Sequence, residues 1–181
     1  SGTELWTRIY DHAENSDKPA SAVVDADNNL IIAATTTSSA NVNDILCLKY
    51  DEDGELTNTY IFDGTAHLDD NAVDILISEN GNLYIGGTSR LVSQRAFVLI
   101  KTDSELGDIW QKTHTLYYGA DLRKIHFNSA TQNIAITGNY TDWENLYLSA
   151  VVVYDKDGNK IFDEYYRTLG NRSAVGFDVI A

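Results

Sequence analysis

The chain has few of the residue types that usually reveal a protein's chemistry. Cys47 is the only cysteine among 181 residues. No disulfide can therefore form within the chain, and no cluster of thiolates can bind a metal. Cys47 lies in an apolar stretch, where packing is its expected role. The absence of methionine leads us to expect either a processed mature form or a piece of a longer protein.

Positive charge and long apolar runs are also scarce. Thirteen lysines and arginines stand against 27 acidic residues, which gives a formal net charge of −14. Such a surface repels phosphate groups, so we expect no nucleic acid partner. No apolar run is long enough to span a membrane as a helix, and we expect no membrane insertion. Hydrophobic residues make up 43%, which is typical of a folded globular protein.

The chain does contain an internal repeat of about 52 residues. A motif that begins with asparagine and continues with apolar and small residues occurs three times, at 29–35, 82–88 and 133–139. A second motif, an apolar run closed by an acidic turn, has its aspartates 52 positions apart, at Asp51, Asp103 and Asp155. Because two unrelated motifs share one period, the repeat reflects an architecture built from equivalent units.

Each period predicts four short β-strands joined by turns, and no segment has a helical pattern. The chain is therefore expected to be all-β. In the second period the expected strands are 72–77, 83–87, 96–102 and 108–115, with a polar connection over 88–95. Acidic turns such as Asp51–Gly54 lack the length and distal glutamate of a calcium loop, so we interpret them as turn chemistry.

The two ends of the chain match the repeat as well. Leu5-Trp6 matches Ile109-Trp110 two periods later, which predicts a partial outer strand over 4–10. The last residues match the start of the second period, which predicts a partial first strand over 174–181. We therefore expect one propeller segment over 1–181, with repeats at about 20–66, 70–119 and 120–170. A closed ring needs at least four blades, so the rest of a longer chain or other copies of this one would complete it.

The repeat contains two hairpin motifs, seen at Asn80–Thr88 and at Leu48–Gly54, and a tryptophan that follows them, seen at Trp110. With them, nearly the whole chain resembles the bacterial repeat family named for seven-bladed β-propellers. Thr57-Asn58 and Ser129–Gln132 depart from the family pattern. The resemblance implies a β-propeller-like array of four-stranded antiparallel blades, with about three complete repeats plus partial terminal strands. It also implies a secreted or cell-surface protein, often one module of a larger one, and no single activity.

No catalytic signature is present. The four histidines are not spaced as zinc ligands, and no nucleophile elbow, phosphate loop or dinucleotide fingerprint occurs. We therefore expect no metal site and no cofactor. Asp74 and Asp178, on first strands, are the nearest candidates for catalytic acids. Their equivalent positions in the repeat favour a structural role.

By analogy with propellers, the loops that join the second strand to the third, and the fourth to the next first strand, form one face. An aromatic side chain beside hydrogen-bonding groups on this face can stack on a sugar or anchor a protein. The expected binding residues are Trp143, Tyr140, Asp142, Arg90, Arg95 and Tyr118.

The sequence thus favours a non-catalytic extracytoplasmic recognition or scaffolding module that binds a protein or a glycan through its loops. Two alternatives remain open. One is a carbohydrate-active hydrolase or lyase with carboxylates at the channel. The other is a structural protein that assembles by strand complementation, since unpaired strand edges invite pairing with another chain.

Overall fold

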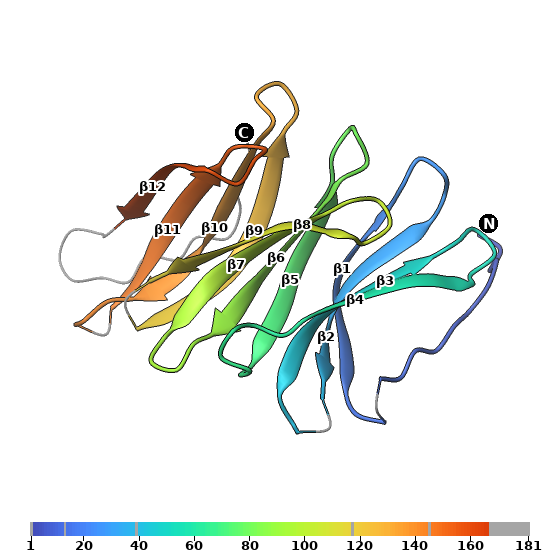
Figure 1. Ribbon diagram of the computed structural model, residues 1–181, viewed down its shortest axis with the longest axis horizontal. Coiled ribbons are helices and arrows are strands. Elements are labelled where there is room, and N and C mark those ends of the chain that lie inside the picture. The colour runs from blue at the N-terminus through green and yellow to red at the C-terminus, as the bar shows by residue number, and fades with distance from the viewer. Residues whose placement is uncertain (1, 13, 39, 117, 145, 167–181) are drawn as a thin grey trace.

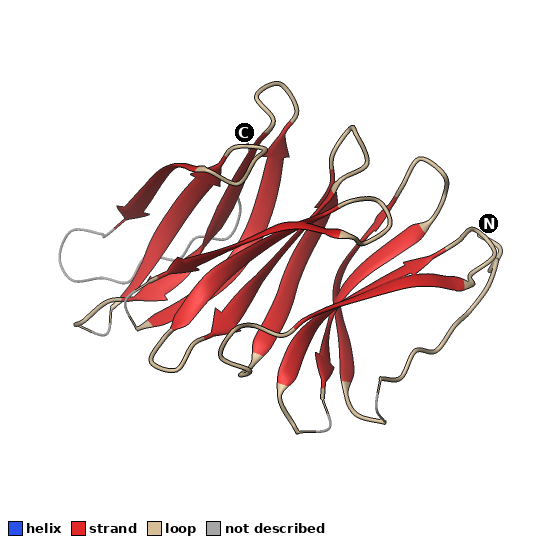
Figure 2. Ribbon diagram, in the orientation of Figure 1, coloured by secondary structure: helices blue, strands red, loops and turns tan. Residues whose placement is uncertain are grey.

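The computed structural model describes residues 2–12, 14–38, 40–116, 118–144 and 146–166. Over these residues the chain is all-β: twelve strands form three four-stranded antiparallel sheets (Figures 1 and 2). No helix occurs in them, and so none that could cross a membrane. The strand expected over 174–181, which includes Asp178, lies outside the described residues.

The strands of each sheet pair in chain order, so that every sheet is a four-stranded meander. The first sheet contains β1 (Asp17–Val24), β2 (Leu30–Thr37), β3 (Asn43–Tyr50) and β4 (Leu56–Phe62). The second contains β5 (Asp70–Ile77), β6 (Leu83–Arg90), β7 (Arg95–Thr102) and β8 (Asp108–Thr115). The third contains β9 (Gly119–Asn128), β10 (Asn133–Thr141), β11 (Tyr147–Tyr154) and β12 (Lys160–Tyr166). The sequence repeat is therefore a repeat of sheets.

The four strands expected in the second period are confirmed, but the polar connection expected over 88–95 is wrong in extent. β6 continues to Arg90 and β7 begins at Arg95, which leaves only 91–94 as the turn. Thr88 and Ser89 are polar yet buried. The hydroxyl of Thr88 accepts a hydrogen bond from the Leu122 amide of the third sheet at 3.1 Å. A polar residue can thus continue a buried strand when a neighbouring sheet satisfies its side chain.

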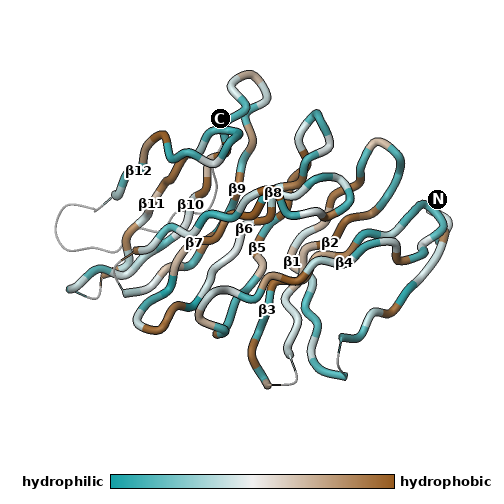
Figure 3. The backbone as a smooth tube through the Cα atoms, viewed as in Figure 1, coloured by the Kyte–Doolittle hydropathy of each residue, from teal (hydrophilic) through white to brown (hydrophobic). Residues whose placement is uncertain are grey.

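The three sheets stack face to face in an open array, with β1, β5 and β9 next to one another (Figure 1). One apolar cluster fills the space between the first and second sheets, and another fills the space between the second and third. The middle strands are consequently buried on both faces, and β7 is buried from Ala96 to Thr102. In Figure 3 the hydrophobic stretches lie mainly along the strands and the hydrophilic ones in the turns. This explains the nearly continuous apolar runs of the third strands.

Polar side chains also connect each sheet to the next. Lys49 on β3 donates to the Ser104 carbonyl of the second sheet at 2.9 Å. Lys101, its counterpart one period later, donates to the Lys156 carbonyl of the third sheet at 2.8 Å. The Trp110 indole donates to that same carbonyl at 3.2 Å. These contacts recur because the sheets stack with the same geometry.

The acidic turns are closed by their own aspartates. In the turn after β3, Oδ1 of Asp51 accepts from the amides of Asp53 at 3.1 Å and Glu55 at 2.8 Å. Asp103 and Asp155 make the same pair of bonds. Hydrogen bonds from Asn159 hold the pKa of Asp155 below its ordinary value. The periodic aspartates therefore act as turn residues.

The partial outer strand expected over 4–10 is not formed. This segment instead packs against the face of the first sheet, where Trp6 and Tyr10 contact a cluster that includes Leu46, Leu48 and Tyr50. A segment that lies on the face of a sheet has no strand edge to pair with. The Trp6 indole still donates to the Glu52 carbonyl at 3.1 Å, which matches the contact of Trp110 two periods later. The two matched tryptophans thus make equivalent contacts, but the strand predicted from the match is absent.

We predict that Cys47 does not react in the folded protein. Its side chain is completely buried between the first and second sheets, and burial raises the pKa of its thiol to about 12. Ellman's reagent at pH 8 should leave the native protein unmodified and should label one thiol per chain after denaturation in guanidinium. Stoichiometric labelling of the native protein would contradict this packing.

Candidate functional site

A shallow pocket lies where the second and third sheets meet, at the end of β6 and the start of β7. Its volume is about 420 Å³. One wall is the turn from Arg90 to Arg95, which is closed by a 2.7 Å hydrogen bond from the Leu91 amide to the Gln94 carbonyl. The other wall is formed by the starts of β9 and β11 and the end of β10. The pocket therefore combines segments from two neighbouring sheets.

Arg90 and Arg95 frame the turn and are oriented by carboxylates. The Arg90 guanidinium lies 3.5 Å from the Asp69 carboxylate, and Arg95 donates to Asp121 at 3.2 Å. The arginine side chains remain 54% and 51% exposed. Each guanidinium group has donors left over after one ion pair. Both arginines can therefore hydrogen-bond a ligand in the pocket.

Two exposed tyrosines line the third-sheet side of the pocket. Tyr118 is 63% exposed and Tyr147 is 53% exposed. The backbone of Tyr118 is fixed by a hydrogen bond from its amide to the Thr141 carbonyl at 3.1 Å. Aromatic faces next to guanidinium groups and a carboxylate can stack on a sugar ring while its hydroxyls are hydrogen-bonded.

The structure brings together three of the six expected binding residues, namely Arg90, Arg95 and Tyr118. Trp143 is 66% exposed in the turn after β10, but it does not line this pocket. An indole this exposed does not fold back over the edge of the sheet. Trp143 thus lies near the candidate site without forming part of its wall.

Tyr140 and Asp142 were expected at the surface, and both are buried. Tyr140 is 6% exposed and packs edge-on against Tyr165, with ring centroids 5.4 Å apart. Asp142 is 4% exposed, and its Oδ1 accepts from the amides of Glu144 at 2.8 Å and Leu146 at 3.0 Å. Tyr140 was expected in a loop, but β10 continues to Thr141 and includes it. These two residues therefore support the turn and do not line the surface.

Asp121 and Tyr147 line the pocket but were not among the expected residues. Asp121 lies within β9, and Tyr147 is the first residue of β11. Neither belongs to a motif, and both share a pocket with Arg90 and Arg95 only because the two sheets stack. An alternation pattern could place Asp121 on one face of its strand, but nothing in the sequence indicates which arginine it would meet.

Of the two candidate catalytic acids, Asp74 is the one within the described residues. It is buried and connects three sheets. Its Oδ1 accepts from the Ser21 hydroxyl of the first sheet at 3.0 Å. Its Oδ2 accepts from the Ile125 amide of the third sheet at 3.3 Å and lies 3.3 Å from the Lys124 ammonium. A carboxylate with both oxygens engaged in this way is suited to holding sheets together.

We predict that Asp74→Ala lowers the free energy of unfolding by about 2 kcal/mol, because it removes several buried hydrogen bonds and leaves their donors unpaired. Urea denaturation followed by tryptophan fluorescence would measure the change. Asp121→Ala is a matched control. It breaks an ion pair whose carboxylate is 44% exposed, and its expected cost is below about 1 kcal/mol. Equal losses in the two variants would contradict the structural role of Asp74.

Comparison with known proteins does not assign this chain to a family. No protein-family profile matches the chain, and no curated protein matches it. The likeness to the propeller repeat family therefore stays a resemblance between motifs, and the case for a function depends on the residues of the site.

Proposed function

We propose that this chain is a non-catalytic, extracytoplasmic recognition module with a propeller-like arrangement, and that it binds a glycan or a protein at the loop face between its second and third sheets. The convergence of Arg90, Arg95 and Tyr118 from two sheets on one accessible pocket is the observation that supports it. Recognition residues on turns held by a rigid scaffold are a common arrangement in binding proteins.

The propeller-like arrangement is supported by the regular stacking of the sheets. Each has four strands in chain order, and the first strands β1, β5 and β9 lie next to one another. The tryptophan and lysine contacts between sheets recur with the sequence period. This is the relationship expected between neighbouring blades around an axis.

A glycan is the ligand that the pocket chemistry favours. The arginines are paired with Asp69 and Asp121, so the site offers both donors and acceptors without a large excess of either charge. The exposed rings of Tyr118 and Tyr147 supply apolar faces of the kind that stack on sugars. A polyhydroxylated ligand uses all three kinds of group, whereas a purely apolar ligand uses only the rings.

The alternative of a glycoside hydrolase finds less support in this pocket. Glycoside hydrolysis normally uses two carboxyl groups on either side of the scissile bond. Among the described residues that line the pocket, Asp121 is the only one with a carboxylate, and it is paired with Arg95. Asp74, the other candidate, is buried between sheets. The residues therefore suit binding better than hydrolysis.

We predict that Tyr118→Ala weakens glycan binding about tenfold, which is the loss expected when one stacking contact of about 1.4 kcal/mol is removed. A panel of immobilised neutral and acidic oligosaccharides would first identify a bound sugar, and calorimetry with that sugar would give the dissociation constant. Arg95→Ala should weaken the same interaction through loss of hydrogen bonds.

Phe162→Ala is the matched control, because Phe162 is a 47% exposed aromatic residue toward the opposite end of the third sheet. It should leave the dissociation constant unchanged. Equal affinity of the Tyr118 variant and the parent protein would exclude this pocket. Binding of a protein ligand in place of any sugar, with the same sensitivity to Tyr118, would favour the protein-binding form of the proposal.

A second candidate function, assembly with another sheet, is favoured by the outer face of the first sheet. A groove of about 350 Å³ remains there, lined in part by Trp6, Tyr10 and Leu46. Leu5 and Ile9 of the neighbouring segment are 88% and 94% exposed. The second and third sheets bury such faces against each other, so a further sheet from a longer chain or another copy would fit here.

If another copy binds this face, sedimentation velocity should show oligomers that grow with protein concentration. Ile9→Asp should suppress them, because a charge would be buried at the contact. Val92→Asp changes an equally exposed residue, at 90%, on the turn after β6 and should have no effect. A protein that stays monomeric over a wide concentration range would rule out assembly through this face.

A further inference from the structure

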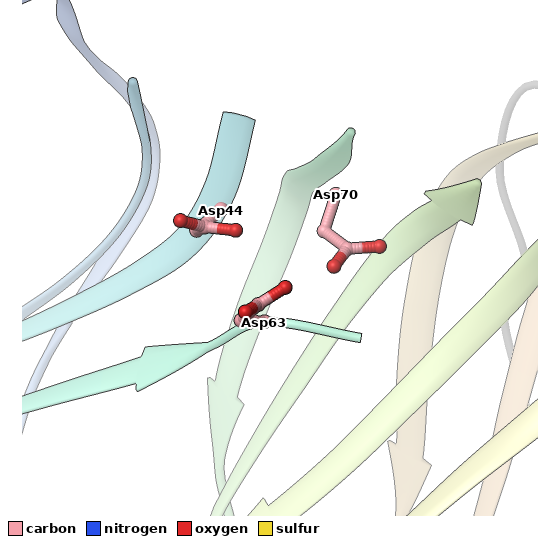
Figure 4. A group of neighbouring side chains, drawn as sticks. All are labelled: Asp44, Asp63 and Asp70. Atoms are coloured by element: carbon pink, nitrogen blue, oxygen red, sulfur yellow. The ribbon is translucent and has the colours of Figure 1, made fainter. Parts of the chain in front are cut away.

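Three carboxylates meet where the first sheet passes into the second. Asp44 is near the start of β3, Asp63 follows the last residue of β4, and Asp70 is the first residue of β5. One oxygen from each lies within 4.8 Å of the others. Figure 4 shows the three side chains directed into a common space between their strands. None of the three acids lines the pocket that contains Arg90 and Arg95.

The cluster contains buried oxygens that lack a partner. Asp70 is fully buried and Asp44 is 8% exposed. In the described part of the chain, Oδ1 of each has no hydrogen-bond partner. The other oxygen of Asp70 accepts from the Gly64 amide at 2.6 Å, and the Ser89 hydroxyl also hydrogen-bonds this carboxylate, so the unsatisfied atom is Oδ1 alone. Buried carboxylate oxygens are rarely left unsatisfied, and these point toward a missing positive partner.

A neutral side-chain oxygen that can serve as a cation ligand lies beside Asp44. Thr36 on β2 is the cross-strand neighbour of Asp44, and such neighbours project from the same face of a sheet. Thr36 is fully buried, and its Oγ1 is also without a hydrogen-bond partner in the described residues. The unsatisfied oxygens of Thr36 and Asp44 thus lie at the same end of the first sheet.

The equivalent place between the second and third sheets shows that the fold does not require these acids. By strand register, Asp44 and Asp63 correspond to the cross-strand pair Ala96 and Thr115. Asp70, which pairs with Ser89, corresponds to Ala120, which pairs with Tyr140. Ala96 and Ala120 are buried. The same junction is therefore stable with small or neutral side chains.

We propose that Asp44, Asp63 and Asp70 form a binding site for a divalent cation of calcium size, which connects the first sheet to the second. Carboxylate and hydroxyl oxygens are the ligands that hard cations prefer. Calcium binds oxygens at about 2.3–2.6 Å, so two oxygens on one ion are at most about 5 Å apart. The observed grouping meets this limit.

The neighbouring charges are consistent with such a site. The His67 ring lies 2.7 Å from Oδ2 of Asp63, but it is 77% exposed and engages that oxygen from outside the cluster. No other cation in the described residues forms an ion pair with the three carboxylates. Burial, followed by the charges of Asp63 and Asp70, raises the pKa of Asp44 to about 6. A bound divalent cation would offset this crowding of negative charge.

The test is calorimetric titration of the chelator-treated protein with calcium chloride, together with thermal unfolding followed by circular dichroism. We expect one calcium ion per chain and a rise in Tm of roughly 5–10 °C at a calcium concentration about 100 times Kd. Asp63→Asn and Asp70→Asn should each weaken binding at least about tenfold. Magnesium should bind more weakly, because it requires shorter and more regular coordination.

Asp53→Asn is the matched control, since it makes the same substitution at an exposed aspartate in the turn at the other end of β3. It should leave the affinity unchanged. Absence of both binding heat and a Tm shift with calcium would overturn the proposal, and so would equal affinities of the Asp53 and Asp63 variants. Tighter binding of magnesium than calcium would overturn the assigned ion size. Because the Asp63 side chain is 44% exposed, its variant provides the test even if Asp70→Asn does not fold.

Discussion

Burial of both faces of the middle strands is the constraint on which the rest of this structure depends. The second sheet has apolar residues on both faces, and the first and third sheets each cover one of them. Residues such as Leu99 and Ile100, neighbours on β7, are both completely buried because they pack against different sheets. The sheets consequently fold as a stack, and the sequence repeat preserves the contacts between one sheet and the next.

This stacking determines where polar chemistry can occur. Inside the stack a polar group needs a specific partner, and Asp74 obtains one from each neighbouring sheet through Ser21 and Ile125. At the ends of the strands the layers separate into turns, where Arg90 and Tyr118 remain accessible. Asp44 and Asp70 differ from both groups. They are buried near the ends of strands, and one oxygen of each has no hydrogen-bond donor among the described residues. That difference separates a structural carboxylate from a candidate cation ligand.

The two proposed sites use the same repeated scaffold in different ways. The pocket between the second and third sheets depends on side chains of a turn that differs from one sheet to the next, and the acidic cluster stands where the next junction has two alanines and a threonine. Function in a repeat protein of this kind is carried by departures from the repeat, because the residues that recur are needed for packing in every unit. Asp51, Asp103 and Asp155 illustrate the opposite case, since their shared role is to close turns.

The sequence by itself determined the all-β class, the repeat and most strand positions, because alternation, apolar runs and turn residues act over a few neighbouring positions. It also identified Arg90, Arg95 and Tyr118 as members of one face. The tertiary structure alone decided that Tyr140 and Asp142 are buried, that residues 4–10 lie on a sheet face, and that Asp44, Asp63 and Asp70 meet. These outcomes depend on how separate sheets stack. The physical reason is that the register and twist of a whole sheet determine which residues meet across two sheets. A pattern of a few neighbouring residues does not contain that information.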